Sequence, residues 1–335
     1  MMKSAILVRP GVIELREVVI PKPSTGEMLI RIKAALTCGT DLKAFRRGHP
    51  VIPMPGAFGH EFSGIIAEAG KGIRRFREGD EIMAVHSAPC LACRYCRKKL
   101  FNLCESIMQT KILGAFSEYI LLPSHIVKQN VFHKPLTLSF EEAALLEPLS
   151  CVVHGMESLH IQENDQALII GSGPIGLFHL ILLKDKGVHV TVMDNNKDKL
   201  RVAKKLGANR VSTPEAERQQ SNFIGFDHVF ECTGIPEVWE SSIRYLRRGG
   251  TVILFGGCKS GTTATYNTGR LHYDEITLRG TFHYSPSDVR KAYALLGSGN
   301  IKLAPLISGR FRLKDTQEVF EMLSQGRGIK YAIIP

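Results

Sequence analysis

The sequence is poor in aromatic residues, and its basic residues do not cluster. Aromatic residues make up 7% of the 335 residues, although the formal net charge is +11. Because Lys and Arg are spread along the whole chain, we expect a solvated, generally basic surface and no nucleic-acid partner. Such a surface also helps to attract anionic cofactors.

A long uninterrupted hydrophobic run is also missing. The longest apolar stretch, residues 168–183, is broken by glycine, serine and proline between Gly171 and Gly176, and it is too short to span a bilayer. The N-terminal MMKSAILVRPG turns polar too early for a secretory signal peptide. We therefore expect a cytoplasmic protein without a membrane partner. In that compartment the eight cysteines are better explained as metal ligands or buried thiols than as disulfides.

The pattern of the chain changes near residue 150. Residues 1–150 contain short β-rich pieces separated by glycine and proline, which predict an irregular β-barrel-like domain. Residues 151–288 alternate strand-like and helix-like segments, from QALIIG and PIGLFHLILLKDKG to GTVILFGG. This alternation predicts an α/β domain with a doubly wound parallel sheet. The tail, residues 289–335, holds a helical pattern, VRKAYALLGSG, and a final strand, KYAIIP, and could belong to either domain.

A glycine-rich turn follows the first strand of the α/β part. The six residues are Gly171, Ser172, Gly173, Pro174, Ile175 and Gly176. The first glycine permits a tight turn, the second lets the backbone approach a pyrophosphate, and the third lets helix and strand pack closely. The N-terminus of the following helix then offers N–H groups and a positive dipole to the phosphates.

An acidic residue completes the dinucleotide fingerprint. Asp194 ends the next predicted strand, about twenty residues after the glycines, as the motif requires. Its carboxylate should accept hydrogen bonds from the ribose hydroxyls and repel a 2′-phosphate, which favours NAD over NADP. Lys197 weakens this inference, because it could pair with the phosphate.

Four cysteines lie within fifteen positions, beside several basic residues. They are Cys90, Cys93, Cys96 and Cys104. This spacing suits a closed tetrahedral zinc site, and the neighbouring cations lower the thiol pKa values and offset the negative charge of the cluster. Because no position is left open, the zinc would be structural. A redox or disulfide role is the alternative.

Three further segments carry potential metal ligands: Cys38 in CGTD, His60 and Glu61 in GHE, and Glu147 in EPL. Each residue alone is unremarkable, since an isolated cysteine or histidine is most often a core or surface residue. Their combination with a nucleotide-binding pattern, a separate N-terminal domain and a zinc lobe makes a catalytic metal site worth testing.

In their order along the chain, CGTD, GHEFSG, the four-cysteine lobe, EPLSCVVHG and GSGPIG resemble the zinc-dependent medium-chain dehydrogenases. The EPLS form is similar to the polyol (sorbitol-type) and threonine dehydrogenase branch, because typical alcohol dehydrogenases have a cysteine in place of Glu147. The resemblance covers essentially the whole chain. It implies a GroES-like barrel in residues 1–150, to which residues 289–335 return, a Rossmann domain, and a homodimer or homotetramer.

The resemblance also implies a catalytic, open zinc site. Cys38 and His60 would bind the metal, and Glu61 would be a third ligand or a close carboxylate. Glu147 would lie at the remaining side of the metal, directly or through water. Two zinc ions per chain are therefore expected, one catalytic and one structural.

Zinc would acidify a bound secondary alcohol, which then transfers hydride to NAD. By the same resemblance Thr40 starts the proton relay, while Lys43 stands where many relatives have a relay histidine. In TLRGTFHY, His283 takes the place of an arginine of sorbitol-type enzymes and is expected to contact a substrate hydroxyl. The expected substrate is a small polar alcohol: a polyol, a cyclitol or a sugar derivative.

Several other functions remain open. A threonine dehydrogenase or a simple secondary-alcohol dehydrogenase is an alternative within the same family. A zinc-free quinone reductase would need neither the ligand set nor the cysteine lobe. An NAD-sensing zinc-binding protein without catalysis would have no need of an open zinc site.

Overall fold

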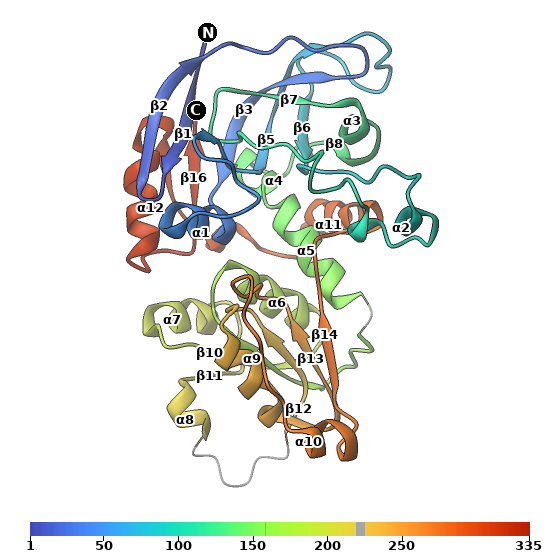
Figure 1. The fold of residues 1–335 in the computed structure, drawn as a ribbon, viewed down its shortest axis with the longest axis vertical. Coiled ribbons are helices and arrows are strands. Elements are labelled where there is room, and N and C mark those ends of the chain that lie inside the picture. Colours follow the sequence, from blue (N-terminus) through green and yellow to red (C-terminus); the bar gives the residue numbers. More distant parts are fainter. Residues whose placement is uncertain (158, 219–224) are drawn as a thin grey trace. The chain divides into compact units, whose positions relative to one another are not determined.

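The structure, a computed structural model, describes residues 1–157, 159–218 and 225–335. The chain divides into two compact units (Figure 1), Met1–Cys151 with Tyr284–Pro335, and Val152–His283. The first division falls inside helix α5 (Leu146–Met156). The return to the first unit, predicted from the sequence at residue 289, falls inside the first turn of α11 (Pro286–Ser298). Tyr284 already belongs to the first unit, where its buried hydroxyl lies 3.0 Å from Ser87 Oγ.

The first unit is built from two mainly antiparallel sheets. One has the order β2-β1-β4, and the other has the order β15-β16-β3-β5-β6-β8, with β7 also paired to β3. Its strands are β1 (Met2–Arg9), β2 (Val12–Val18), β3 (Met28–Leu36), β4 (Gly56–Ala57), β5 (Glu61–Ala69), β6 (Glu81–Ala84), β7 (Tyr119–Leu122), β8 (Val131–His133), β15 (Ile307–Arg312) and β16 (Lys330–Ile334).

The C-terminal tail completes this unit. Strand β16 pairs antiparallel with β3, so the red end of the chain lies beside a blue strand in Figure 1. The helices of the unit, besides α5 and α11, are α1 (Gly39–Arg47), α2 (Arg94–Arg97), α3 (Ser124–Asn130), α4 (Phe140–Ala143) and α12 (Thr316–Ser324). Phe58, Phe116 and Phe320 meet in the core with ring centroids 4.9 to 5.8 Å apart, and thereby join the tail to the barrel.

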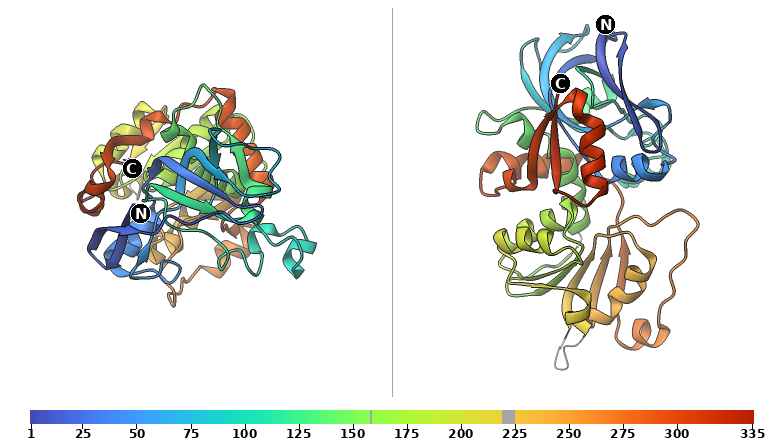
Figure 2. Two further views of the ribbon diagram at one scale, coloured as in Figure 1. Left: turned by 90° about the horizontal axis from the view of Figure 1, so that it is seen from above. Right: turned by 90° about the vertical axis from the view of Figure 1, so that its left-hand side faces the viewer.

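The second unit is a parallel sheet of order β11-β10-β9-β12-β13-β14, and this confirms the predicted doubly wound fold. Helices α6 and α7 cover one face and α9 the other (Figure 2). The elements are β9 (Gln166–Ile170), α6 (Pro174–Asp185), β10 (His189–Met193), α7 (Lys197–Lys205), β11 (Arg210–Ser212), α8 (Pro214–Arg218), β12 (Phe226–Glu231), α9 (Pro236–Ser242), β13 (Leu246–Leu254), α10 (Thr268–Tyr273) and β14 (Thr277–Gly280).

Burial explains the central position of β9. Four of its five residues are buried, as expected for a parallel strand covered on both faces. The strand order reverses beside it, because β10 lies on one side and β12 on the other. Ligands of such sheets bind at the carboxyl ends of the strands next to this reversal. Among the described helices, none is long and apolar enough to cross a membrane.

Candidate metal centres and nucleotide-binding turn

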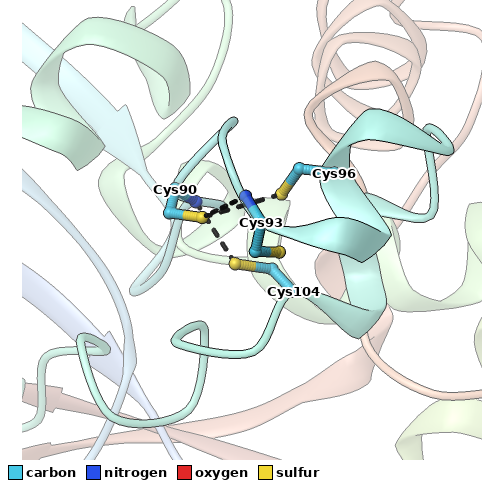
Figure 3. Close-up of side chains that lie close together, drawn as sticks. All are labelled: Cys90, Cys93, Cys96 and Cys104. Atoms are coloured by element: carbon cyan, nitrogen blue, oxygen red, sulfur yellow. Dashed lines mark hydrogen bonds between the residues drawn. The ribbon is translucent and has the colours of Figure 1, made fainter.

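The four cysteines of the lobe converge on one point (Figure 3). Cys93 precedes the short helix α2, Cys96 lies within it, and Cys104 follows a 3-10 turn. All four sulfur atoms lie within 4.8 Å of one another, and Cys90 Sγ is 3.9 Å from Cys96 Sγ. A tetrahedral zinc with Zn–S bonds of about 2.3 Å would place its sulfurs roughly 3.8 Å apart. The donor set therefore fits a zinc ion.

Backbone N–H groups prepare these sulfurs for a metal. The N–H of Cys93 and that of Ala92 donate to Cys90 Sγ at 3.3 and 3.5 Å, and the N–H of Cys90 donates to Cys104 Sγ at 3.3 Å. The bonds from Ala92 and Cys93 lower the pKa of the Cys90 thiol to about 6. Thiolate is the form that binds zinc, so this local geometry favours metal binding at Cys90, whereas burial raises the pKa of the Cys96 thiol to about 12.

The lobe has little hydrophobic core of its own. Its buried cluster consists of Cys96, Cys104 and Ile107, packed against the half-buried Cys93, Phe101 and Met108. Two of the three fully buried members are expected ligands. A bound metal would therefore take the place of a core in holding this lobe together.

A second convergence lies in the barrel. Cys38 is the residue before the first turn of α1, and His60 and Glu61 lie where β5 begins. Their ligand atoms lie within 4.8 Å of one another. A thiolate, an imidazole and a carboxylate are the ligand types of catalytic zinc sites, and three of them leave a position open. This donor set also fits zinc.

Two of these residues have charged partners that sequence analysis did not single out. Asp41 Oδ1 lies 3.4 Å from His60 Nδ1, and Asp41 is fully buried. Burial disfavours the charged imidazole, yet Asp41 and Cys38 raise the pKa of His60 well above its ordinary value. The Lys330 ammonium donates to Glu61 Oε1 at 2.8 Å and to the Thr37 carbonyl at 2.7 Å. Asp41 was visible within CGTD, whereas no local signal connects Lys330 with residue 61.

Glu147 lies in another polar group of the first unit. It is in the first turn of α5, and its Oε1 lies 3.5 Å from His86 Nδ1. Tyr284 OH is 3.2 Å from the same nitrogen, and the Cys151 thiol donates to Glu147 Oε1 at 3.8 Å. Burial raises the pKa of Glu147 to about 7.

The two polar groups are neighbours, because the rings of His60 and His86 lie 4.9 Å apart. No pattern in the sequence singled out His86. His86 lies four residues before Cys90, and nothing in that segment of the sequence indicated that the His86 imidazole would be buried beside Glu147.

The remaining predicted residues lie on two elements. Thr40 and Lys43 are half-buried residues of α1, the helix that begins after Cys38. His283 is the last residue of the second unit, is half-buried, and has a left-handed backbone with φ of +61°. That conformation is uncommon outside glycine and aims the side chain differently from a regular strand.

The glycine-rich turn has the geometry that its sequence predicts. Gly171 has a φ of +101°, and Pro174 is the first residue of α6. A Cβ on Gly176 would overlap the Gly171 carbonyl oxygen, so only glycine allows helix and strand to pack this closely. A Cβ on Gly173 would meet nothing within 4 Å, which leaves that side of the turn open for a phosphate. Ile175 follows in the first turn of α6.

Asp194 follows β10 and contacts this turn. Its Oδ2 accepts hydrogen bonds from Ser172 N at 2.6 Å and Ser172 Oγ at 2.7 Å. Its Oδ1 accepts from Asn196 N at 2.8 Å. The expected ribose-binding carboxylate and the expected phosphate-binding turn are therefore joined by direct hydrogen bonds.

Two family models match the chain. The alcohol dehydrogenase GroES-like domain matches residues 24–131, and the zinc-binding dehydrogenase domain matches residues 174–298. The first match lies in the barrel unit and the second begins at α6.

Curated relatives and solved structures agree with these matches. D-altritol 5-dehydrogenase from Agrobacterium fabrum is 32% identical, over 93% of this chain and 93% of that protein. D-arabinitol dehydrogenase 1 from Uromyces fabae is 30% identical, over 94% and 92%. A structure described as a zinc-binding dehydrogenase from Sinorhizobium meliloti 1021, bound to NADP, is 30% identical with a TM-score of 0.90 and covers 100% of this chain and 99% of that one.

Proposed function

This chain belongs to the zinc-dependent medium-chain dehydrogenases, in their polyol dehydrogenase branch, and from this premise we propose that it oxidises a secondary hydroxyl of a polyol, cyclitol or sugar derivative with NAD. Its cofactors are zinc and a nicotinamide dinucleotide, and its activity is that of an alcohol or polyol dehydrogenase. The observation that carries the proposal is the convergence of Cys38, His60 and Glu61 within 4.8 Å, which offers three ligands and leaves a position for a substrate oxygen.

The residues of the barrel unit divide the work of this reaction. We propose that Cys38, His60 and Glu61 hold the catalytic zinc and that Glu147 faces the fourth position through water, which a substrate oxygen would replace. A bound zinc would acidify a coordinated hydroxyl, and the nicotinamide would accept its hydride. Asp41 orients the imidazole of His60 by contacting its Nδ1. Lys330 orients the carboxylate of Glu61 through their ion pair.

Proton removal and substrate recognition are assigned to three other residues. Thr40 starts the proton relay, and its place on α1 next to Cys38 supports this role. Lys43, one turn further along the same helix, and His283 contact hydroxyls of the substrate. The structural zinc is assigned to Cys90, Cys93, Cys96 and Cys104.

The polar surroundings of Glu147 support a substrate with several hydroxyl groups. The carboxylate of Glu147 and the imidazole of His86 lie 3.5 Å apart and are both buried. A polyol can exchange further hydrogen bonds with such buried polar groups, whereas an apolar alcohol offers only its single hydroxyl. The names of the two relatives, an altritol and an arabinitol dehydrogenase, favour the same class.

The turn and Asp194 support NAD as the coenzyme. We propose that Gly171, Gly173, Pro174, Ile175 and Gly176 bind the pyrophosphate. Asp194 would accept from the ribose hydroxyls. Its carboxylate would repel the 2′-phosphate of NADP in a partly desolvated site.

A substrate panel with both coenzymes tests the function. The purified chain is assayed for NADH or NADPH formation with acyclic polyols, a cyclitol, a simple secondary alcohol and L-threonine. We expect the highest kcat/KM for a polyol or cyclitol with NAD. Turnover of L-threonine or of the simple alcohol that is orders of magnitude better than every polyol and cyclitol would contradict the substrate class. A kcat/KM for NADP equal to or above that for NAD would contradict the coenzyme.

We also propose a cytoplasmic homodimer or homotetramer. All eight cysteines are free, which suits a reducing compartment. In the described part of the chain, β14 pairs only with β13 and so forms an edge of the sheet that a second copy could cover. Sedimentation analysis checks the assembly, and a monomer at micromolar concentration would contradict it.

A further inference from the structure

Protein donors already fill most of the positions at which the Asp194 carboxylate can accept a hydrogen bond. A carboxylate has about four lone-pair positions, two on each oxygen. Ser172 N and Ser172 Oγ take both positions on Oδ2, and Asn196 N takes one on Oδ1. One position therefore remains for a ligand.

A ribose with both hydroxyls free needs two such positions. The 2′- and 3′-hydroxyls of the adenosine ribose of NAD each carry one O–H donor. Because one position is open on Asp194, its carboxylate can accept a hydrogen bond from the second ribose hydroxyl only if one of the three protein donors leaves. NADP differs, because its 2′-oxygen carries a phosphate in place of a hydroxyl. Only the 3′-hydroxyl of its ribose therefore needs an acceptor position on Asp194.

The three donors on Asp194 differ in their freedom to move. Two are backbone N–H groups, held by the glycine-rich turn and by the residues that lead into α7. The third is the Ser172 hydroxyl, whose hydrogen turns about a single bond. The two backbone bonds alone keep the carboxylate oriented. The hydroxyl is therefore the donor that can be displaced, and its loss would not release Asp194.

We propose that the Ser172 hydroxyl occupies the acceptor position of Asp194 that the second ribose hydroxyl of NAD needs, and that it thereby weakens the binding of NAD but not of NADP. The inference deepens the proposed function, since it rests on Asp194 being the ribose-binding residue. Ser172 is then a residue that sets coenzyme selectivity, although the glycine motif leaves its position unspecified. Its side chain is fully buried, so the displaced hydroxyl loses a hydrogen bond that bulk water does not replace directly.

Ser172→Ala in the full chain tests the proposal. Coenzyme affinity is measured by titrating the fluorescence of NADH and, separately, of NADPH, without any substrate. We expect the Kd for NADH to fall roughly ten- to a hundredfold, the range of one hydrogen bond to a charged group, while the Kd for NADPH stays the same. Ser172→Cys replaces the hydroxyl with a somewhat larger group that donates more weakly, and it should shift the Kd for NADH in the same direction.

Ser241→Ala is the matched control, because Ser241 lies on α9 and its hydroxyl donates to the Val238 carbonyl. It should change neither Kd. An unchanged or raised Kd for NADH in both Ser172 variants would overturn the proposal, and so would equal tightening for the two coenzymes. If the unchanged protein bound neither coenzyme, the proposed function itself would fall together with this inference.

Discussion

At the residue scale, three of the four expected ligands of the open zinc site contact a further polar residue. Asp41 contacts His60, Lys330 contacts Glu61, and His86 contacts Glu147. Such partners fix the orientation of a ligand and its capacity to donate electrons to the metal. Of the three, His86 is the residue whose role can be tested by substitutions that preserve its shape.

Replacing His86 with phenylalanine should weaken metal binding. The aromatic ring would still pack against His60 and Tyr284, whose ring centroids lie 4.9 and 6.1 Å away, but the nitrogen facing Glu147 would be lost. We expect a loss of about 10- to 100-fold in zinc affinity at the open site. His86→Asn, which can place an amide nitrogen near the lost Nδ1, should restore most of it. Competition with a chromophoric chelator measures the affinity.

His133→Phe provides the control for this prediction. His133 is a half-exposed histidine of β8 in the same unit. Its substitution should leave zinc affinity unchanged. If His86→Phe retained zinc as tightly as the unchanged protein, His86 would have no part in positioning Glu147.

At the element scale, the cysteine lobe shows how short elements depend on a metal. Helix α2 has four residues and the following 3-10 turn has three, so neither is stable by itself. Their small buried cluster is made largely of cysteine. The free energy that holds the lobe in place must therefore come mainly from metal binding.

Cys104→Ser should lower the thermal stability of the protein. Serine is a poor zinc ligand, and the loss of one of four sulfurs opens the closed site. We expect a lower Tm, or insoluble protein, and the loss of one zinc per chain, measured by differential scanning fluorimetry and metal analysis. Cys258→Ser, in a loop of the second unit, is the control and should change neither value. Unchanged zinc content and Tm in Cys104→Ser would disprove a structural zinc at the lobe.

At the scale of the whole molecule, the two units carry different parts of the function. All the expected zinc ligands belong to the barrel unit, and the glycine-rich turn and Asp194 belong to the second unit. Each unit has its own hydrophobic core. Loss of the open zinc site should therefore leave the fold of the second unit intact.

Cys38→Ser tests this separation. We expect one zinc per chain in place of two, almost no turnover, and a Kd for NADH and a circular dichroism spectrum like those of the unchanged protein. Metal analysis, steady-state assays and fluorescence titration check the three expectations. A zinc content that stays at two per chain would show that Cys38 is not a ligand, and a lost fold would show that the two functions are not separable.

The sequence by itself determined the features that lie within a few neighbouring residues. The glycine-rich turn occupies six positions, and its φ and close packing follow from the absence of a Cβ. The four cysteines fall within fifteen positions, so any compact folding of that segment brings their sulfurs together. The alternation of strands and helices after residue 150 predicted a parallel sheet, because short crossovers allow few other arrangements.

Only the tertiary structure decided which distant residues meet. Lys330 reaches Glu61 across 269 positions, and Tyr284 reaches His86 across 198. Pairing of β16 with β3 is what brings Lys330 to the site, and the sequence around either strand carries no mark of that register. The sequence likewise gave no sign of a role for the Ser172 hydroxyl, which became visible only because the end of β10 places Asp194 within hydrogen-bond distance of it. Neighbouring residues determine the local chemistry of each motif. The residues that orient its side chains depend on how strands from opposite ends of the chain pair.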